Sequence, residues 1–509
     1  MNNRLSRNRA ALYLLLNLAV LTATSIGWSF SPASFGLLIY ANLLFALCAV
    51  PLLWIEELNG RYALLGIFMT MYFLLFGALD VRDLITGSTP SVPREGFLTP
   101  AQIGVLLGAT CVLIAYRLAV QLGSRAGEES VSTDWPTSAL LVVGLGLFVS
   151  GMLAMAYFQL VLATENTTRS TMQAFATMGP FLTFAVMLGQ LAQPLGAVIL
   201  GYGYAKSRSP LWILLITIVV GSQVLLGFLT DTKGTVLLAF VMVAVTQTLW
   251  DGRIAKLWLF AIVAFATLMF PILQANRVVR AEHGWNRAEV LENLGTVLDA
   301  AIEQSGKVYE TRAGERSQTF LERTSGEVIL ETLFDKVTES GDYLNGSTLR
   351  AIVFTFIPRL LLPDKGDVPV GQLFNRTYMH GSKDDFLYLS VSMLGEMYWN
   401  FGWPGVIVGN LLFGGLLGLI GVRTSLAQSR SITRLLILLL TVKVLCRGYE
   451  DSLAISFVNW LRCMAAIGLL HLAFSRTTKP AHEASEAGSS LAGSAPVPAA
   501  AVRFPNLMR

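Results

Sequence analysis

Cationic side chains gather in one polar segment, residues 276–402, of a chain that is otherwise strongly apolar. Arg277 and Arg280 lie about one helical turn apart, so they would project from the same side of a helix. Further along, Pro358 fixes the backbone before Arg359, and a rigid backbone holds a guanidinium in place. Arginine forks bind phosphates and carboxylates through paired hydrogen bonds, so these residues suit an anionic substrate. Headgroup contacts and structural ion pairs are the alternative roles.

Four more cations extend this group. Lys233 lies in a short charged hairpin, 231–234, between two apolar runs, where a lysine offers a compact positive charge at the membrane surface. A solvated turn is the other interpretation of that hairpin. Arg350, Lys365 and Arg376 surround the Pro358 segment. We predict a substrate-binding role for Lys233, Arg277, Arg280, Arg350, Lys365 and Arg376.

A single carboxylate stands out at the end of the polar segment. Glu396 lies among apolar and aromatic residues, and partial desolvation there favours a proton-accepting role. Pairing with an arginine such as Arg359 at a helix end is the alternative. Tyr398, Trp399 and Trp403 suit an aromatic belt at a membrane interface, or stacking on sugar rings. We predict Glu396 and Arg359 as catalytic residues.

The composition shows what kind of protein must position these residues. Apolar residues make up 54% of the 509 residues and charged residues only 14%, with a mean hydropathy of +0.59. Soluble domains carry about 25% charged residues. Recurring runs of about 20 apolar residues therefore predict an all-α polytopic membrane protein. The net charge of +4 does not indicate nucleic-acid binding, and the four cysteines form no Cys-x-x-Cys pair that would suggest zinc or disulfides.

The apolar runs predict about twelve transmembrane helices around a large, partly helical outward loop. Residues 172–204 contain Pro194 and are either one kinked helix or a surface helix followed by a span. The expected spans are residues 11–28, 33–54, 62–79, 101–121, 138–160, 180–204, 211–229, 235–250, 256–273, 403–422, 432–446 and 453–474. The chain thus divides into a membrane domain with nine spans (1–275), the large loop (276–402), a membrane domain with three spans (403–476) and a disordered tail (477–509).

The charge distribution gives this arrangement an orientation. The short outward loops receive only Arg82, Arg94, Arg169, Lys233 and Arg447, and the other side receives the excess of arginine and lysine. The positive-inside rule then places both termini in the cytoplasm and the large loop in the periplasm of a bacterium. Apolar stripes at residues 288–304 and 322–337 predict helices within that loop, and residues 342–346 predict a turn.

Together these features resemble the Wzy-type polysaccharide polymerases, the oligosaccharide repeat-unit polymerase group. The likeness rests on the many spans, the large outward loop before the last three, and three short motifs. Among departures, the family often has arginine where Lys233 stands. The motifs are Thr-Asp-Thr-Lys-Gly at 230–234, Ile-Pro-Arg at 357–359 with Pro363 and Lys365, and Ser-Met-Leu-Gly-Glu-Met-Tyr-Trp-Asn-Phe-Gly at 392–402.

The resemblance implies a glycosyltransferase of the bacterial inner membrane. It would polymerise undecaprenyl-diphosphate-linked repeat units into O-antigen, capsule or exopolysaccharide, by an inverting displacement without metal or other cofactor. Its partners would be the lipid-linked glycans and membrane lipid, with a chain-length regulator and a flippase as further candidates. An O-antigen ligase is the first alternative. A glycolipid flippase is the second, although it would need charges inside the spans, where only Lys443 and Arg462 occur.

Overall fold

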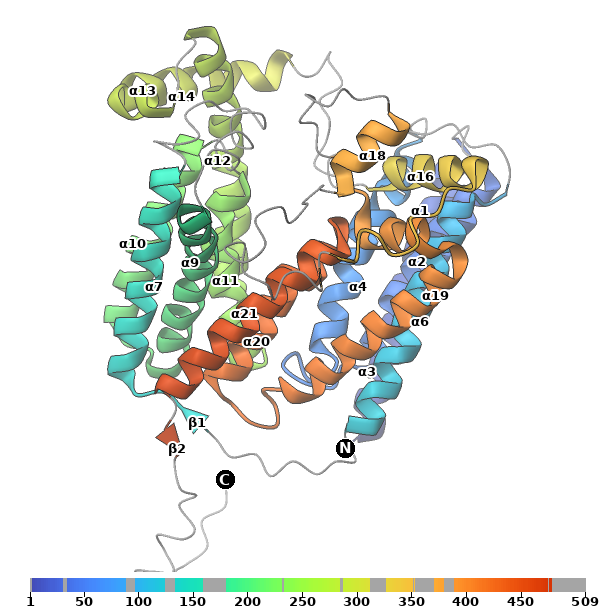
Figure 1. Ribbon diagram of the computed structural model, residues 1–509, viewed down its shortest axis with the longest axis horizontal. Helices are drawn as coiled ribbons and strands as arrows, with labels where there is room; N and C mark the ends of the chain where they lie inside the picture. Colours follow the sequence, from blue (N-terminus) through green and yellow to red (C-terminus); the bar gives the residue numbers. More distant parts are fainter. Residues whose placement is uncertain are drawn as a thin grey trace, which may run out of the picture.

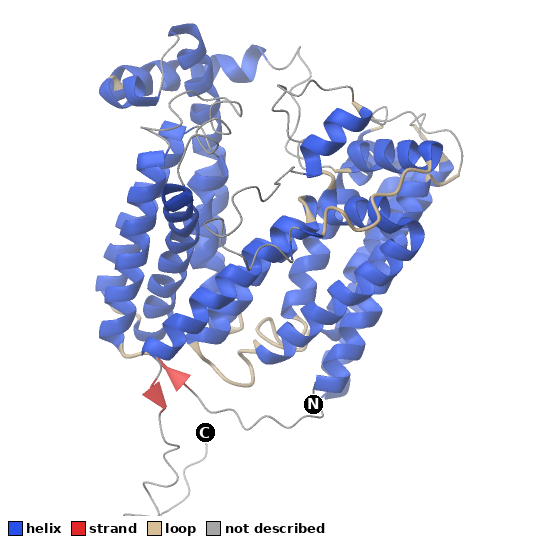
Figure 2. Cartoon of the chain, in the orientation of Figure 1, coloured by secondary structure: helices blue, strands red, loops and turns tan. Residues whose placement is uncertain are grey.

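The computed structural model of the protein describes residues 2–30, 34–87, 97–123, 133–158, 180–230, 233–283, 287–311, 326–350, 352, 370–379, 389–474 and 476–477. Helices dominate this part of the chain, as Figure 2 shows. Its one β element is a two-residue antiparallel pairing between β1 (Thr133–Asp134) and β2 (Arg476–Thr477). The expected all-α class is therefore confirmed for the described residues.

The helices fall into two groups with a pair of helices between them (Figure 1). The first group contains α1 (Asn2–Trp28), α2 (Phe35–Ala49), α3 (Pro51–Trp54), α4 (Ala63–Phe76), α5 (Ala78–Thr86), α6 (Pro100–Gly123), α16 (Glu327–Ser340), α18 (Val370–Tyr378) and α19 (Ser392–Arg423). The second contains α7 (Thr137–Tyr157), α9 (Pro180–Ser207), α10 (Pro210–Thr230), α11 (Lys233–Asp251), α12 (Lys256–His283), α13 (Arg287–Glu292) and α14 (Leu294–Thr311).

Between the groups runs α20 (Ile432–Thr441), which continues as the π-helical segment η3 (Val442–Cys446) and the 3₁₀ segment η4 (Arg447–Glu450). The chain then returns along α21 (Leu453–Phe474). On one side α20 contacts α9 and α11, and on the other side η3 contacts α4 and α21 contacts α19. The last two long hydrophobic segments therefore connect the two groups.

Several helices meet the length and hydropathy of a membrane span. Among the described residues seven do so, and an eighth span results if α4 and α5, which meet at a 53° bend, cross together. The described parts of the expected spans are helical, while their number, twelve, stays a prediction. The protein is therefore built as a membrane protein. Pro194 lies inside one helix, α9, which starts at Pro180. Residues 172–179 lie outside the described residues, so both alternatives for residues 172–204 stay predictions.

Glycines bring helices together within each group. A methyl group on Gly414 of α19 would lie 2.6 Å from the Val112 carbonyl oxygen of α6, and one on Gly418 would lie 2.7 Å from Ala119. In the second group Gly196 of α9 approaches α7 in the same way. Small residues allow helix backbones in a membrane to pack closely, so van der Waals contact replaces the missing hydrophobic driving force.

The helices of the polar segment lie at one end of the molecule and the start of the chain lies at the other (Figure 1). At the first end are α13, α14, α16 and α18. Of these, α13 and α14 confirm helix at 288–304, and α16 confirms it for the described part of 322–337. At the other end the loop before α20 binds the loop before α4, since Leu426 N–H donates to the Asn59 carbonyl at 3.0 Å. The polar segment thus forms a cap on one end of the helical groups.

Candidate functional site

The first feature of the site is a break in α19. The backbone of Gly402 has φ 63° and ψ −147°, a conformation that is open essentially to glycine alone. Two residues later, Pro404 has no N–H group and cannot bond to the Asn400 carbonyl. The expected span at 403–422 thus begins at the break. Residues 392–401 were expected to belong to the loop. They are instead helical and form the first part of α19, before the break.

The turn after α16 supplies the partners that the broken helix lacks. Leu344 N–H donates to the Trp399 carbonyl at 2.9 Å, and Asn345 N–H donates to the Asn400 carbonyl at 3.1 Å. Asn345 and Gly346 both have positive φ, which confirms a turn at the end of residues 342–346. The polar cap therefore holds the break in α19 through its backbone.

Glu396 lies six residues, or nearly two turns, before the break at Gly402 and is 0% exposed. Its Oε2 accepts a hydrogen bond of 2.6 Å from the backbone N–H of Leu453, the first residue of α21. The carboxylate therefore caps the positive end of α21. The alternative weighed from the sequence, pairing of Glu396 with Arg359, involves a residue outside the described part of the chain and stays a prediction. Oε1 is buried and accepts no hydrogen bond from the described residues.

Polar side chains surround this carboxylate. The hydroxyl groups of Thr348 and Ser452 lie beside it. Asn400 Nδ2 donates to Thr348 Oγ1 at 2.8 Å and to the Glu396 carbonyl at 2.8 Å. Within the described part of the chain, Asn400 Oδ1 is buried without a hydrogen-bond partner. Buried polar atoms are nearly always bonded, so this group is suited to a bound hydroxyl-bearing molecule or water. The sequence alone does not single out Thr348 or Ser452, because an isolated hydroxyl residue has no distinctive spacing.

The hairpin between α20 and α21 adds two more carboxyl groups next to Ser452. Burial raises the pKa of both Glu450 and Asp451, and mutual repulsion raises that of Glu450 further. The Arg447 guanidinium opposes this, with its Nε 3.7 Å from Glu450 Oε1. The Ser390 hydroxyl donates to the Glu450 carbonyl and ties the hairpin to the segment before α19. Carboxyl groups therefore concentrate at the start of α21.

The aromatic residues near Glu396 have a structural role. Tyr398 stacks on Phe334 of α16 with 3.7 Å between ring centroids, and it is 2% exposed. Trp399 is 1% exposed and contacts Phe374 and Tyr378 of α18. The suggested interface belt or sugar-stacking role is therefore wrong for Tyr398 and Trp399, because the helices of the polar cap cover both rings. They fix α16 and α18 on α19.

The predicted cations are described to different degrees. Arg350 is exposed at the end of the turn that contains Thr348, and Arg376 is half-buried on α18. Lys233 is the first residue of α11, and Arg277 and Arg280 lie on α12 as expected, with side chains outside the described part. Arg359 and Lys365 lie outside the described residues altogether. Convergence of the eight predicted residues on one site stays a prediction.

A second acidic group lies at the same end of the molecule. Asp80 and Asp83 lie on α5 and are 3% and 2% exposed. The bend between α4 and α5 is where α16 begins, because Gly326 N–H donates to the Leu75 carbonyl at 3.1 Å. The next residue, Glu327, is also buried. Acidic residues in an otherwise apolar sequence were the signal for this group, since such residues are seldom buried without a role.

The geometry at Glu396 defines what the site can do. The N–H group of Leu453 holds one carboxylate oxygen and fixes its orientation. The other oxygen, Oε1, can accept a proton from a hydroxyl group that reaches it. Comparison of the chain with protein families, with curated proteins and with solved structures finds no match. The function is therefore argued from the residues and their arrangement.

Proposed function

We propose that the protein is a glycosyltransferase that joins lipid-linked oligosaccharide repeat units at the membrane surface. The proposal rests above all on Glu396, a buried carboxylate with one oxygen fixed by Leu453 N–H and with the Thr348 and Ser452 hydroxyls beside it. This carboxylate lies in the 392–402 motif that resembles the Wzy-type polymerases. The cations of the polar segment provide for a donor that carries a diphosphate.

The reaction is a single displacement. A hydroxyl oxygen of the acceptor glycan attacks the anomeric carbon of the donor, and the bond from that carbon to the diphosphate oxygen breaks. The diphosphate leaves with the bonding electrons, and Arg359, Arg277, Arg280 and Lys233 stabilise its charge. Glu396 takes or orients the proton of the attacking hydroxyl. The configuration of the anomeric carbon is inverted.

The membrane arrangement follows the same proposal. Twelve spans, with both termini in the cytoplasm, would carry the polar cap into the periplasm, where the lipid-linked glycan is presented. The arrangement in Figure 1 supports this, because α13, α14, α16 and α18 lie at the end opposite the start of the chain. The excess of arginine and lysine at the end where the chain begins agrees with it.

The test is a glycan gel from a strain that lacks the gene, complemented with the wild type or a variant. Glu396→Gln and Arg359→Ala should each abolish the polymer ladder and leave single lipid-linked repeat units, although the protein still reaches the membrane. The control is Glu339→Gln on α16, which removes an exposed carboxylate that pairs within its own helix, with Lys336 at 3.0 Å. It should leave the ladder intact.

Other results would decide against the proposal. Free long polymer in the strain without the gene would identify a ligase that moves finished glycan to a lipid acceptor. An unchanged ladder in that strain would refute polymerisation altogether. Normal chain length with Arg359→Ala or Glu396→Gln would refute the site.

A further inference from the structure

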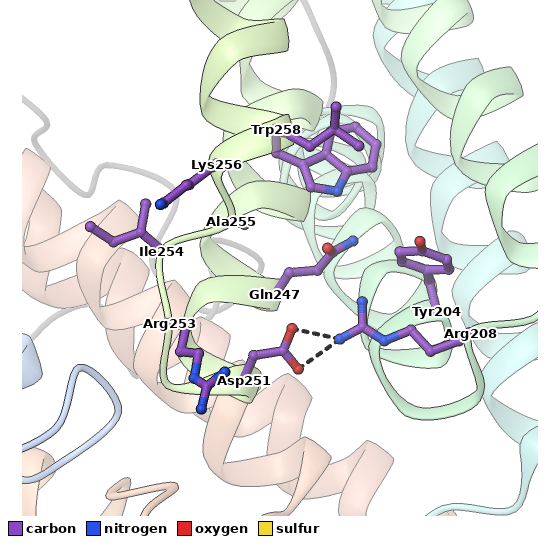
Figure 3. A pocket seen from close by; sticks show the side chains of 10 residues that line it. Tyr204, Arg208, Gln247, Asp251, Arg253, Ile254, Ala255, Lys256 and Trp258 are labelled. Carbon is purple, nitrogen blue, oxygen red and sulfur yellow. Dashed lines mark hydrogen bonds and ion pairs between the residues drawn. The ribbon is translucent and has the colours of Figure 1, made fainter.

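A basic hollow lies at the end of the second helix group that is remote from Glu396. It has a volume of about 530 Å³, and it is formed where α9 and α11 end and α12 begins (Figure 3). Pockets of about 300–1,000 Å³ are typical of small-molecule sites. Its lining residues are Tyr204, Arg208, Gln247, Asp251, Arg253, Ile254, Ala255, Lys256, Leu257 and Trp258.

The charges of the hollow are unbalanced. Arg208 donates to both oxygens of Asp251, at 2.7 and 2.5 Å, so this cation and this carboxylate neutralise each other. Arg253 and Lys256 also line the hollow, and both are exposed. The lining therefore keeps two positive charges without a matching carboxylate of its own. An occupant with two negative charges would complete it.

A buried amide points to an occupant with acceptor atoms. Gln247 is only 5% exposed, and its Nε2 has no hydrogen-bond partner in the described structure. In Figure 3 the amide lies between the Trp258 ring and the Arg208–Asp251 pair. An unpaired buried donor is costly and therefore rare. A phosphate oxygen within the hollow would provide the missing acceptor.

The backbone of Arg208 is strained, which indicates a role for its side chain in the hollow. Arg208 has φ 52°, a left-handed conformation that is unfavourable for any residue with a side chain. Its N–H closes the end of α9 by donating to the Tyr204 carbonyl at 2.8 Å, a position at which glycine is usual. The guanidinium stacks over the Tyr204 ring at 5.3 Å. Glycine would adopt this backbone conformation without strain, so the presence of arginine indicates that its side chain has a role there.

The rim of the hollow is apolar and favours a lipid over a free anion. Ile254 and Leu257 line it, yet they are 57% and 76% exposed. Next along α12, Phe260 is 71% exposed, and Leu211 at the start of α10 is 51% exposed. The α10 helix is long and apolar enough to span a membrane. Exposed apolar residues beside a span can contact the acyl chains of a lipid, whereas a dissolved phosphate gains nothing from contact with them.

We propose that this hollow binds the headgroup of an anionic phospholipid that carries two phosphodiester groups. Arg253 and Lys256 neutralise the two phosphates, and Gln247 Nε2 donates to a phosphate oxygen. The acyl chains lie along Leu257 and Phe260 of α12. The bound lipid joins the ends of α9 and α11 to the start of α12 and so stabilises the second helix group.

The test uses the full-length protein in detergent, with its melting temperature followed as lipid is added. Cardiolipin, a phospholipid with two phosphodiester groups, should raise the melting temperature, and phosphatidylcholine and inorganic phosphate should not. In the double variant Arg253→Gln, Lys256→Gln the cardiolipin concentration for half of the effect should rise about 30-fold. The control Arg9→Gln removes a cation near the start of α1 and should leave that concentration unchanged.

A second variant tests the amide. Gln247→Leu should raise the melting temperature without lipid, because it removes an unpaired buried donor, and it should reduce the shift that cardiolipin causes. Equal protection by inorganic phosphate would overturn the lipid assignment in favour of a free-anion site. Equal protection by phosphatidylcholine, or an unchanged cardiolipin dependence in the double variant or in Gln247→Leu, would overturn the site itself.

Discussion

Replacement of Gly402 by alanine tests whether the break in α19 is required. In the native conformation a side chain at this φ and ψ costs about 1–3 kcal/mol. The added methyl group would also lie 3.2 Å from the Tyr343 ring, closer than an ordinary contact. The alternative is to straighten the helix, which would sacrifice the hydrogen bonds of Leu344 and Asn345 to α19, each worth about 1 kcal/mol. Either way we expect Gly402→Ala to destabilise the protein by about 2–3 kcal/mol.

The measurement is thermal unfolding of purified Gly402→Ala in detergent, together with the glycan gel from the complemented strain. Gly415 provides a matched control, because it lies on the same helix and an added methyl group would meet nothing within 4 Å. Gly415→Ala should leave the ladder intact and stabilise the helix by up to about 1 kcal/mol.

Glu396 and Asn400 lie in the two turns before the break, so a shift of the break moves both polar groups. We therefore expect Gly402→Ala to shorten or abolish the polymer at temperatures where the variant is still folded. A melting temperature equal to that of Gly415→Ala would refute the strain argument. A lower melting temperature with a normal ladder would refute the link between the break and the site.

Two further changes probe packing and pH dependence. Gly414→Val should lower the melting temperature far more than Gly415→Ala, since its side chain would meet the Val112 carbonyl and force α6 and α19 apart, at a cost of about 1–3 kcal/mol or more. Burial, reinforced by a neighbouring carboxylate, raises the pKa of Glu450 above its ordinary 4.5, so the folded protein holds this proton more tightly than the unfolded chain does. Stability from this group is thus present at low pH and is lost as the pH rises through the raised pKa. In thermal unfolding, Glu450→Gln should flatten the decline of the melting temperature above pH 4.5, and an unchanged profile would contradict the assignment.

Much of the architecture was accessible from the sequence, because long apolar runs and one-sided apolar stripes have few alternatives to helices. The stripe at residues 322–337 became α16, and the runs became the helices of both groups. The start of α19 was placed too late, at Trp403 instead of Ser392. Gly402 and Pro404 indicate a break in the helix, so the sequence favours a start after them. The sequence does not reveal that the turn at Leu344 bonds to the carbonyl groups before the break, where the helix has already begun.

The site was harder to predict than the helices. Glu396 stood out because a carboxylate is rare in an apolar stretch, but its partners are Thr348 and Leu453, far away along the chain. Only packing brings those residues together. The rings of Tyr398 and Trp399 gave the wrong prediction for a related reason, since an aromatic residue beside a span suits an interface and a covered core equally well.

The buried position of Glu396 makes its two roles hard to separate by deletion. Removal of the side chain would leave the Leu453 N–H group without a partner and weaken the start of α21, so the loss of polymer would follow from misfolding as well as from lost chemistry. Glutamine keeps an oxygen that can accept from Leu453 N–H, but its amide is not basic. Glu396→Gln therefore preserves the cap of α21 and removes the proton acceptor. A folded Glu396→Gln protein without polymer would assign Oε1 to the chemistry, whereas a folded and active one would leave Glu396 with the helix cap alone.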